Sequence, residues 1–194
     1  MPQKRPAPRL ALIDEAQMNE AQRALLASLR TGPRGQSMTA RGPFAVWMHA
    51  PELGELAQKL GAHCRYRTAL PPRLSEFAIL CTARAWRAQY EWYAHEPMAA
   101  KAGVKPKTIA DLRAGREPKS APKDERAIYA FAQELYKTRR VSDPTYRRVQ
   151  SLLGDRATVE LVGILGYYAL ISMTLNAFNM LPPENEKLAF AEPK

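Results

Sequence analysis

The sequence predicts an all-α protein, and three observations support this fold class. Apolar residues recur three and four positions apart along most of the 194 residues, and no run resembles a strand meander. Prolines stand where helices would begin and glycines where they would end. The composition is 46% hydrophobic, which fits one folded domain and excludes wholesale disorder. We expect seven to nine helices and no significant sheet.

Capping residues and breakers divide the first half of the chain. Asp14 is placed to cap a helix that runs to Ser28 or Arg30, with Gly32 just after its end. Residues 31–42 contain three glycines and a proline and should form a loop. The helices expected next cover residues 44–49, residues 51–66, a segment opened by Leu70-Pro-Pro72 or Ser75, and residues 90–102, where Pro97 marks a kink or a first turn.

The second half contains three shorter helical patterns and one long apolar one. The three patterns cover residues 104–115, 123–140 and 142–154. Residues 161–180 carry no charge, and a helix of that length spans about 30 Å, enough for a bilayer. Its polar residues and the lack of interfacial anchors favour a buried core or subunit-interface helix over a membrane span. In this helix Gly163 and Gly166 would allow another helix to approach closely.

The chain is strongly basic, with a net charge of +10 and a pI near 9.8. The bases are dispersed, and even the densest stretch, residues 137–148, lacks zinc-finger spacing, an RNA-binding signature or a leucine zipper. A helix-turn-helix stays open from pattern alone. A dispersed surplus more often maintains solubility and attracts anionic small molecules. We therefore expect a small anionic organic substrate as partner, with no nucleic acid and no membrane.

The cysteines and the N-terminus bear on the cellular compartment. Cys64 and Cys81 do not form a C-x-x-C pair, and we expect both to be reduced thiols. Residues 1–9 are basic and proline-rich, and no apolar secretory core follows them, so this stretch reads as a solvated tail. Together these features predict a cytoplasmic protein.

Three side chains between residues 73 and 96 are the best candidates for chemistry. Glu91 and His95 are four residues apart, so on a helix they share a face, and the carboxylate can orient the imidazole for general acid–base work. Glu76 would lie about 28 Å from His95 on one unbroken helix. If the helix instead breaks at residues 85–87 and folds back, Glu76 and His95 become neighbours. No glycine or proline marks that break.

At this point the sequence resembles the carboxymuconolactone decarboxylase family, which includes the AhpD-like alkylhydroperoxidases. The peroxidases of that family have a glutamate, a Cys-x-x-Cys pair twelve residues later, and a histidine four residues after the second cysteine. Glu76 and His95 match the glutamate and the histidine, whereas Ala88 and Glu91 stand at the cysteine positions. Further similarity lies in Arg41-Gly-Pro-Phe44, Pro51-Glu-Leu53, Leu70-Pro-Pro-Arg-Leu74, and the segments 130–135, 141–143 and 167–181.

The resemblance implies an AhpD-like multi-helix bundle with a central helical hairpin. It covers roughly three-quarters of the chain, which gives residues 1–40 as an N-terminal tail and leading helix, 41–183 as the family domain and 184–194 as a C-terminal tail. Members of the family are usually homo-oligomers, so the resemblance implies a trimer or hexamer.

Without the cysteine pair, the peroxidase route of the family has no nucleophile. What remains is an acid–base pair similar to what the decarboxylase branch would use. We therefore expect a cofactor-independent lyase or isomerase, with no metal, that acts on a small carboxylated lactone or ring acid. In this hypothesis His95 is the acid–base group, oriented by Glu91 or Glu76. The expected substrate-binding residues are Arg87, Arg84 and Arg73 for a carboxylate, and Trp92, Trp47, Tyr66 and Tyr93 for the ring.

Two other functions remain open. The same scaffold would serve a non-catalytic, oligomeric binding protein, since His95 could be an ordinary helix histidine and the aromatic residues could be core packing. A thiol peroxidase would have to use Cys81 or Cys64 in a rearranged way. The lyase hypothesis predicts a pocket where Glu76, Glu91 and His95 converge, whereas the binding hypothesis predicts a filled site or one where the residues do not meet.

Overall fold

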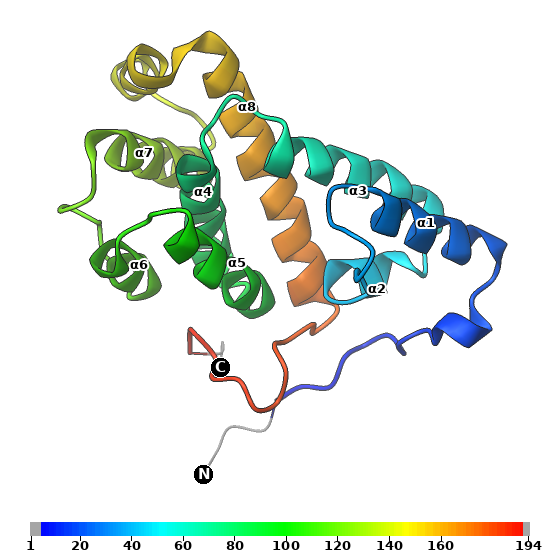
Figure 1. Cartoon of the computed structure of the whole chain (residues 1–194). Coiled ribbons are helices and arrows are strands. Elements are labelled where there is room, and N and C mark those ends of the chain that lie inside the picture. The colour runs from blue at the N-terminus through cyan, green and yellow to red at the C-terminus, as the bar shows by residue number, and fades with distance from the viewer. Residues whose placement is uncertain (1–4, 192–194) are drawn as a thin grey trace.

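The computed structural model describes residues 5–191 and confirms the all-α fold class (Figure 1). Within these residues there are eight α-helices, one short 3-10 helix at Glu15–Gln17, and no strand. The α-helices are α1 (Glu20–Thr31), α2 (Pro43–Trp47), α3 (Pro51–Tyr66), α4 (Pro72–Ala85), α5 (Gln89–Lys101), α6 (Pro106–Arg113), α7 (Lys123–Thr138) and α8 (Asp143–Ala177).

Proline begins most of these helices, as the sequence predicts. Pro43, Pro51, Pro72 and Pro106 each occupy the first turn of a helix, where a missing N–H costs no hydrogen bond. The predicted start of the first helix was wrong. Asp14 caps only the 3-10 turn, and α1 begins later because Asn19 and Gln22 form a reciprocal capping box.

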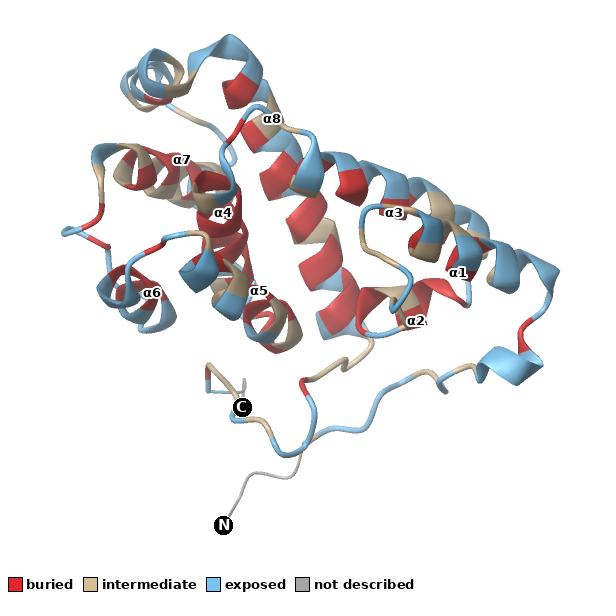
Figure 2. Ribbon diagram, viewed as in Figure 1, coloured by how far each residue is buried: buried red, intermediate tan, exposed pale blue. Residues whose placement is uncertain are grey.

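The molecule is organised around α4 and α8. In Figure 1, α4 to α7 lie on one side of α8, and α1 to α3 lie on the other. Every residue of α4 from Leu74 to Ala83 is buried, which Figure 2 shows as an almost continuous red helix. A helix enclosed on all sides needs apolar residues around its whole circumference, and α4 contains the charged Glu76 as an exception. That exception marks the candidate site.

The helix α8 is long and apolar enough to cross a membrane, but 56% of its most apolar stretch is buried inside the protein. Gly154, with φ of 80°, interrupts it where the sequence predicts a helix end. Beyond Gly154 one face packs on α3, α4 and α7. This face makes α8 a core helix of the bundle.

The opposite face of α8 is open. Val159, Val162 and Met173 are exposed, and a Cβ added at Gly163 or Gly166 would meet nothing within 4 Å. The expected close helix approach at these two glycines therefore does not occur within residues 5–191. The homo-oligomer stays a prediction.

The two ends of the described chain are tied together on one side of the bundle (Figure 1). Arg9 N donates to Phe178 O over 3.0 Å, and the Arg5 guanidinium donates to the Pro183 carbonyl over 2.9 Å. Residues 6–9 are exposed, as predicted for a solvated tail, but they run along the C-terminal segment. Within that segment the buried Phe190 packs edge-on against Trp92, with ring centroids 5.2 Å apart. The expectations for residues 1–4 and 192–194 lie outside the described residues.

Candidate functional site

The chain reverses direction between α4 and α5 at the predicted place. Arg87 adopts a positive φ of 52°, and Ala88 N donates to Ala83 O over 2.9 Å. Contacts from distant segments hold this turn. The Asn176 side chain donates to Trp86 O over 2.8 Å, and the Arg87 guanidinium donates to Ala191 O. The hairpin therefore forms without a glycine or proline at its turn.

The hairpin brings Glu76, Glu91 and His95 together. His95 Nδ1 donates to Glu76 Oε2 over 2.7 Å, and His95 Nε2 lies 3.0 Å from Glu91 Oε1. All three residues are buried, with exposed fractions of 7% for Glu76, 3% for Glu91 and 5% for His95. Their convergence is the geometry that the lyase hypothesis predicts, whereas the role of each residue stays a prediction.

The two carboxylates control the charge of His95. Burial of the ring lowers its pKa, but the negative charge of Glu91 and the hydrogen bond to Glu76 outweigh burial and raise the pKa to about 9. The ring is therefore an imidazolium at neutral pH, held between two carboxylates. Glu91 Oε1 has no other partner and completes no well-aligned hydrogen bond with the ring.

A cavity of about 390 Å³ opens beside this cluster, in the size range of small-molecule sites. Glu91 and His95 form part of its wall, whereas Glu76 lies behind His95. The cavity is lined further by residues of the loop between α1 and α2, and by Tyr167 and Tyr168 of α8. Tyr168 contacts the His95 ring edge-on, with centroids 5.1 Å apart. Burial raises the pKa of both tyrosines, so their hydroxyls are neutral donors at pH 7.

The arginines expected to bind a substrate carboxylate are not in this cavity. Arg73 pairs with Asp124 over 2.5 Å and also with Glu125. Arg84 donates to the Arg113 carbonyl, and Arg87 is bound to Ala191 at the hairpin turn. Each is satisfied by a protein group elsewhere, so the expectation that they line the site needs correction. The arginines that do line the cavity are Arg34, Arg41 and Arg65.

The aromatic residues that line the cavity also differ from those that the sequence predicts. Tyr66 lines the cavity as expected. Trp47 and Trp92 are core residues instead, because their rings fill space between helices and Trp92 Nε1 is satisfied by Glu96 Oε2 over 2.8 Å. Tyr93 lies outside the cavity and is 38% exposed. The aromatic lining is completed by Phe44, Tyr90, Tyr167 and Tyr168.

The cysteines give no support to a peroxidase. The two positions that carry cysteine in the family peroxidases hold the buried Ala88 and Glu91. Burial raises the pKa of Cys64 to about 11 and that of Cys81 further, so both stay protonated thiols rather than reactive thiolates. Within residues 5–191 no group of His, Cys, Asp or Glu is arranged to hold a metal ion.

Together the fold and the site define a helical-bundle protein with a buried histidine between two carboxylates at the wall of a cavity. Residues 51–134, from α3 through most of α7, match the model of the carboxymuconolactone decarboxylase family, so this region of the chain is similar to that family. No curated protein gave a significant match to the chain. The matched region contains Glu76, Glu91 and His95, whereas Arg34, Arg41, Tyr167 and Tyr168 lie outside it.

Gly61 of α3 sets the position of Tyr167, and this predicts a stability effect. A Cβ added at Gly61 would collide with the ring and hydroxyl of Tyr167. We expect Gly61→Ala to lower the free energy of unfolding by about 1–3 kcal/mol, as overpacking does. Gly163→Ala is the matched control, because its Cβ meets only open space and the change should be neutral or stabilising by up to about 1 kcal/mol. Equal urea midpoints for the two variants would contradict the close contact.

Proposed function

We propose that this protein is a member of the carboxymuconolactone decarboxylase family and a cofactor-independent lyase or isomerase that acts on a small carboxylated lactone or ring acid. The observation that carries the proposal is the His95 imidazolium between Glu76 and Glu91 at the cavity wall. An imidazolium with a pKa of about 9 is a proton donor at neutral pH. Glu76 fixes the orientation of the ring from behind.

The cavity lining supports the substrate class. Arg34, Arg41 and Arg65 bring three cations to a cavity whose remaining walls are largely aromatic. Guanidinium groups bind carboxylates through paired hydrogen bonds, and aromatic rings pack against a planar ring. A volume of about 390 Å³ fits a ring acid of this kind.

In the decarboxylase form of the reaction, the bond between a ring carbon and its carboxylate breaks, and carbon dioxide leaves. The electron pair of that bond is delocalised onto the lactone carbonyl oxygen as an enolate, which the arginines and the tyrosine hydroxyls stabilise. A proton from His95 Nε2, passed directly or by way of Glu91, then forms the new C–H bond. Solvent returns one proton to His95, so each turnover consumes one proton and releases one carbon dioxide.

The proposal is tested with carboxymuconolactone in deuterated water. We expect release of carbon dioxide and one deuterium on a ring carbon of the enolate that it leaves, and we expect Glu91→Gln to lower kcat roughly 100-fold. Glu96→Gln is the matched control, since Glu96 lies on the same helix but bonds Trp92 and Arg113. No release from this lactone or from related ring acids that bind would contradict the lyase.

A second candidate function is a non-catalytic binding protein. One observation favours it: both ring nitrogens of His95 already face a carboxylate, so the ring is tied down on both sides. Such a cluster could serve only to hold α4 and α5 together. Binding of ring acids by the wild type without any turnover is the result that this candidate predicts.

A further inference from the structure

Arg34 reaches the cavity from the loop between α1 and α2, outside the region that matches the family model. Its guanidinium is held by hydrogen bonds to Gln58 and to the Tyr167 hydroxyl, and by stacking on Phe44. Nη1 donates to Gln58 Oε1 over 3.0 Å, Nη2 donates to Gln58 O over 3.2 Å, and the group stacks on Phe44 with 5.0 Å to the ring centroid. The Arg34 side chain is thus fixed in position although it comes from a loop.

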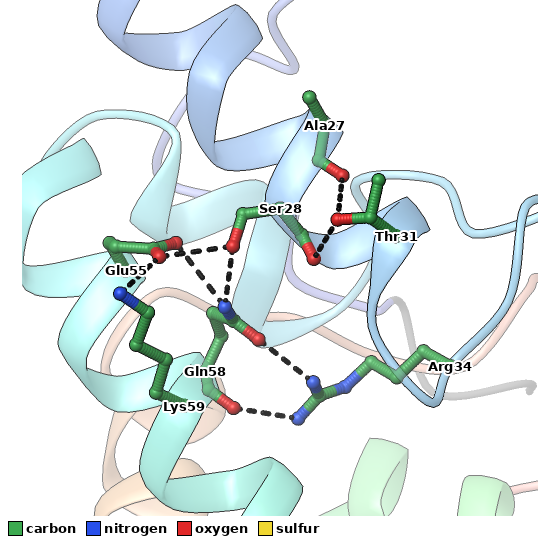
Figure 3. A network of polar contacts seen from close by, with 7 residues as sticks. All are labelled: Ala27, Ser28, Thr31, Arg34, Glu55, Gln58 and Lys59. Carbon is green, nitrogen blue, oxygen red and sulfur yellow. Dashed lines mark hydrogen bonds and ion pairs between the residues drawn. The ribbon is translucent and has the colours of Figure 1, made fainter.

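Gln58 is itself oriented by a network that joins α1 and α3 (Figure 3). Its Nε2 donates to Ser28 Oγ over 2.8 Å and to Glu55 Oε2 over 3.2 Å. Because these acceptors engage the NH2 end of the amide, the oxygen end must point to Arg34. Gln58 is 4% exposed, so water does not compete for these bonds.

The partners of Arg34 leave its positive charge uncompensated. The groups that hold it are an amide oxygen, a carbonyl, a phenyl ring and the Tyr167 hydroxyl, all neutral. The nearby Glu55 pairs with Lys59 over 2.9 Å. Across the described residues no carboxylate lies within the 4 Å of an ion pair from Arg34. The cavity therefore contains a preorganised cation whose positive charge is not paired and can bind an anion.

We propose that Arg34 is a specificity-determining residue that binds a carboxylate of the substrate, and that Gln58 is its positioning residue. This inference rests on the proposed function, since it assigns the substrate carboxylate to a particular side chain. A glutamate at position 58 would still accept from Arg34 but would neutralise it, and its second carboxylate oxygen would face Glu55 in place of the amide NH2. The neutral amide is therefore what keeps the cation available to substrate.

The test uses isothermal titration calorimetry with two probes, phthalate as a ring dicarboxylate and phthalide as an uncharged lactone. We expect Arg34→Gln to weaken phthalate binding roughly 10- to 100-fold, the range for losing a charge-assisted hydrogen bond, and to change phthalide binding less than about twofold. Gln58→Glu should have a similar effect on phthalate while Arg34 is still present. Arg147→Gln, which removes the same charge from an exposed site on α8, is the control and should change neither.

The ratio of phthalate to phthalide affinity separates positioning from a general structural defect, because damage to the cavity would weaken both probes. Unchanged phthalate affinity in Arg34→Gln, or no phthalate binding by the wild type, would overturn the proposal. A loss of both probes in Gln58→Glu would overturn the positioning role. Arg34-dependent binding without any turnover would leave this inference standing and refute the lyase. Turnover that is unchanged in Arg34→Gln would support the lyase and overturn this inference.

Discussion

Replacing His95 with glutamine is expected to abolish turnover while the protein stays folded. The glutamine amide can still donate a hydrogen bond to Glu76, but it cannot carry the proton that the imidazolium delivers. Loss of a general acid lowers kcat by about 10²- to 10⁴-fold. The measurement is carbon dioxide release, with circular dichroism to check the fold.

His63→Gln is the matched control for this experiment, because His63 lies exposed on α3 and pairs only loosely with Glu160, at 3.8 Å. Retained turnover in His95→Gln would refute the assignment of the acid. Alanine at the same position is a poorer test. It leaves two buried carboxylates without their cation, and breaking a buried pair in this way costs about 3–5 kcal/mol.

The stability of the protein should fall as the pH rises from about 6.5 to 9. The pKa of His95 is 6.5 in the unfolded chain and about 9 in the folded protein, so the folded state binds the proton more tightly. The contribution of His95 to the free energy of unfolding is complete below pH 6.5 and is lost as the pH rises through 9. A shift of this size corresponds to about 3 kcal/mol.

Urea unfolding of the wild type and of His95→Gln at pH 6, 8 and 10 measures this contribution. In the unfolded chain the tyrosines and thiols also lose protons up to about pH 10. This happens in both proteins, so the difference between the two curves isolates His95. We expect the wild type to lose more stability than the variant over this range. Parallel curves would show that His95 gains no proton affinity on folding.

The parts of the fold that the sequence predicts well are those with a local cause. Proline at a helix start and glycine at a helix end act through the backbone of a few residues, so Pro51, Pro72 and Gly154 were informative. The meeting of Glu76 and His95 followed from the spacing of the two residues once the chain was assumed to fold back. The turn itself had no local signal, because distant groups such as Asn176 hold Arg87 in its conformation.

The residues that line the cavity could not be predicted in the same way. The arginines expected to bind a carboxylate were close to His95 in sequence. In the fold, however, Arg73 forms an ion pair with Asp124 of α7, and Arg87 donates a hydrogen bond to the C-terminal segment. Arg34 and Arg41 lie in an irregular loop, which has no periodicity to show which way its side chains face. The three glycines of residues 31–42, with arginines between them, were the available signal, and they indicated only a loop.

The C-terminal segment has a consequence for how the protein is made. The Gln89 side chain holds the backbone of Phe190 at both its N–H and its carbonyl, and Arg87 holds Ala191. The helices that carry Glu76 and His95 emerge from the ribosome long before these residues are translated. The turn between them thus acquires these restraints only after Phe190 and Ala191 have been made, so a nascent chain stalled before Phe190 would carry the α4–α5 hairpin without them.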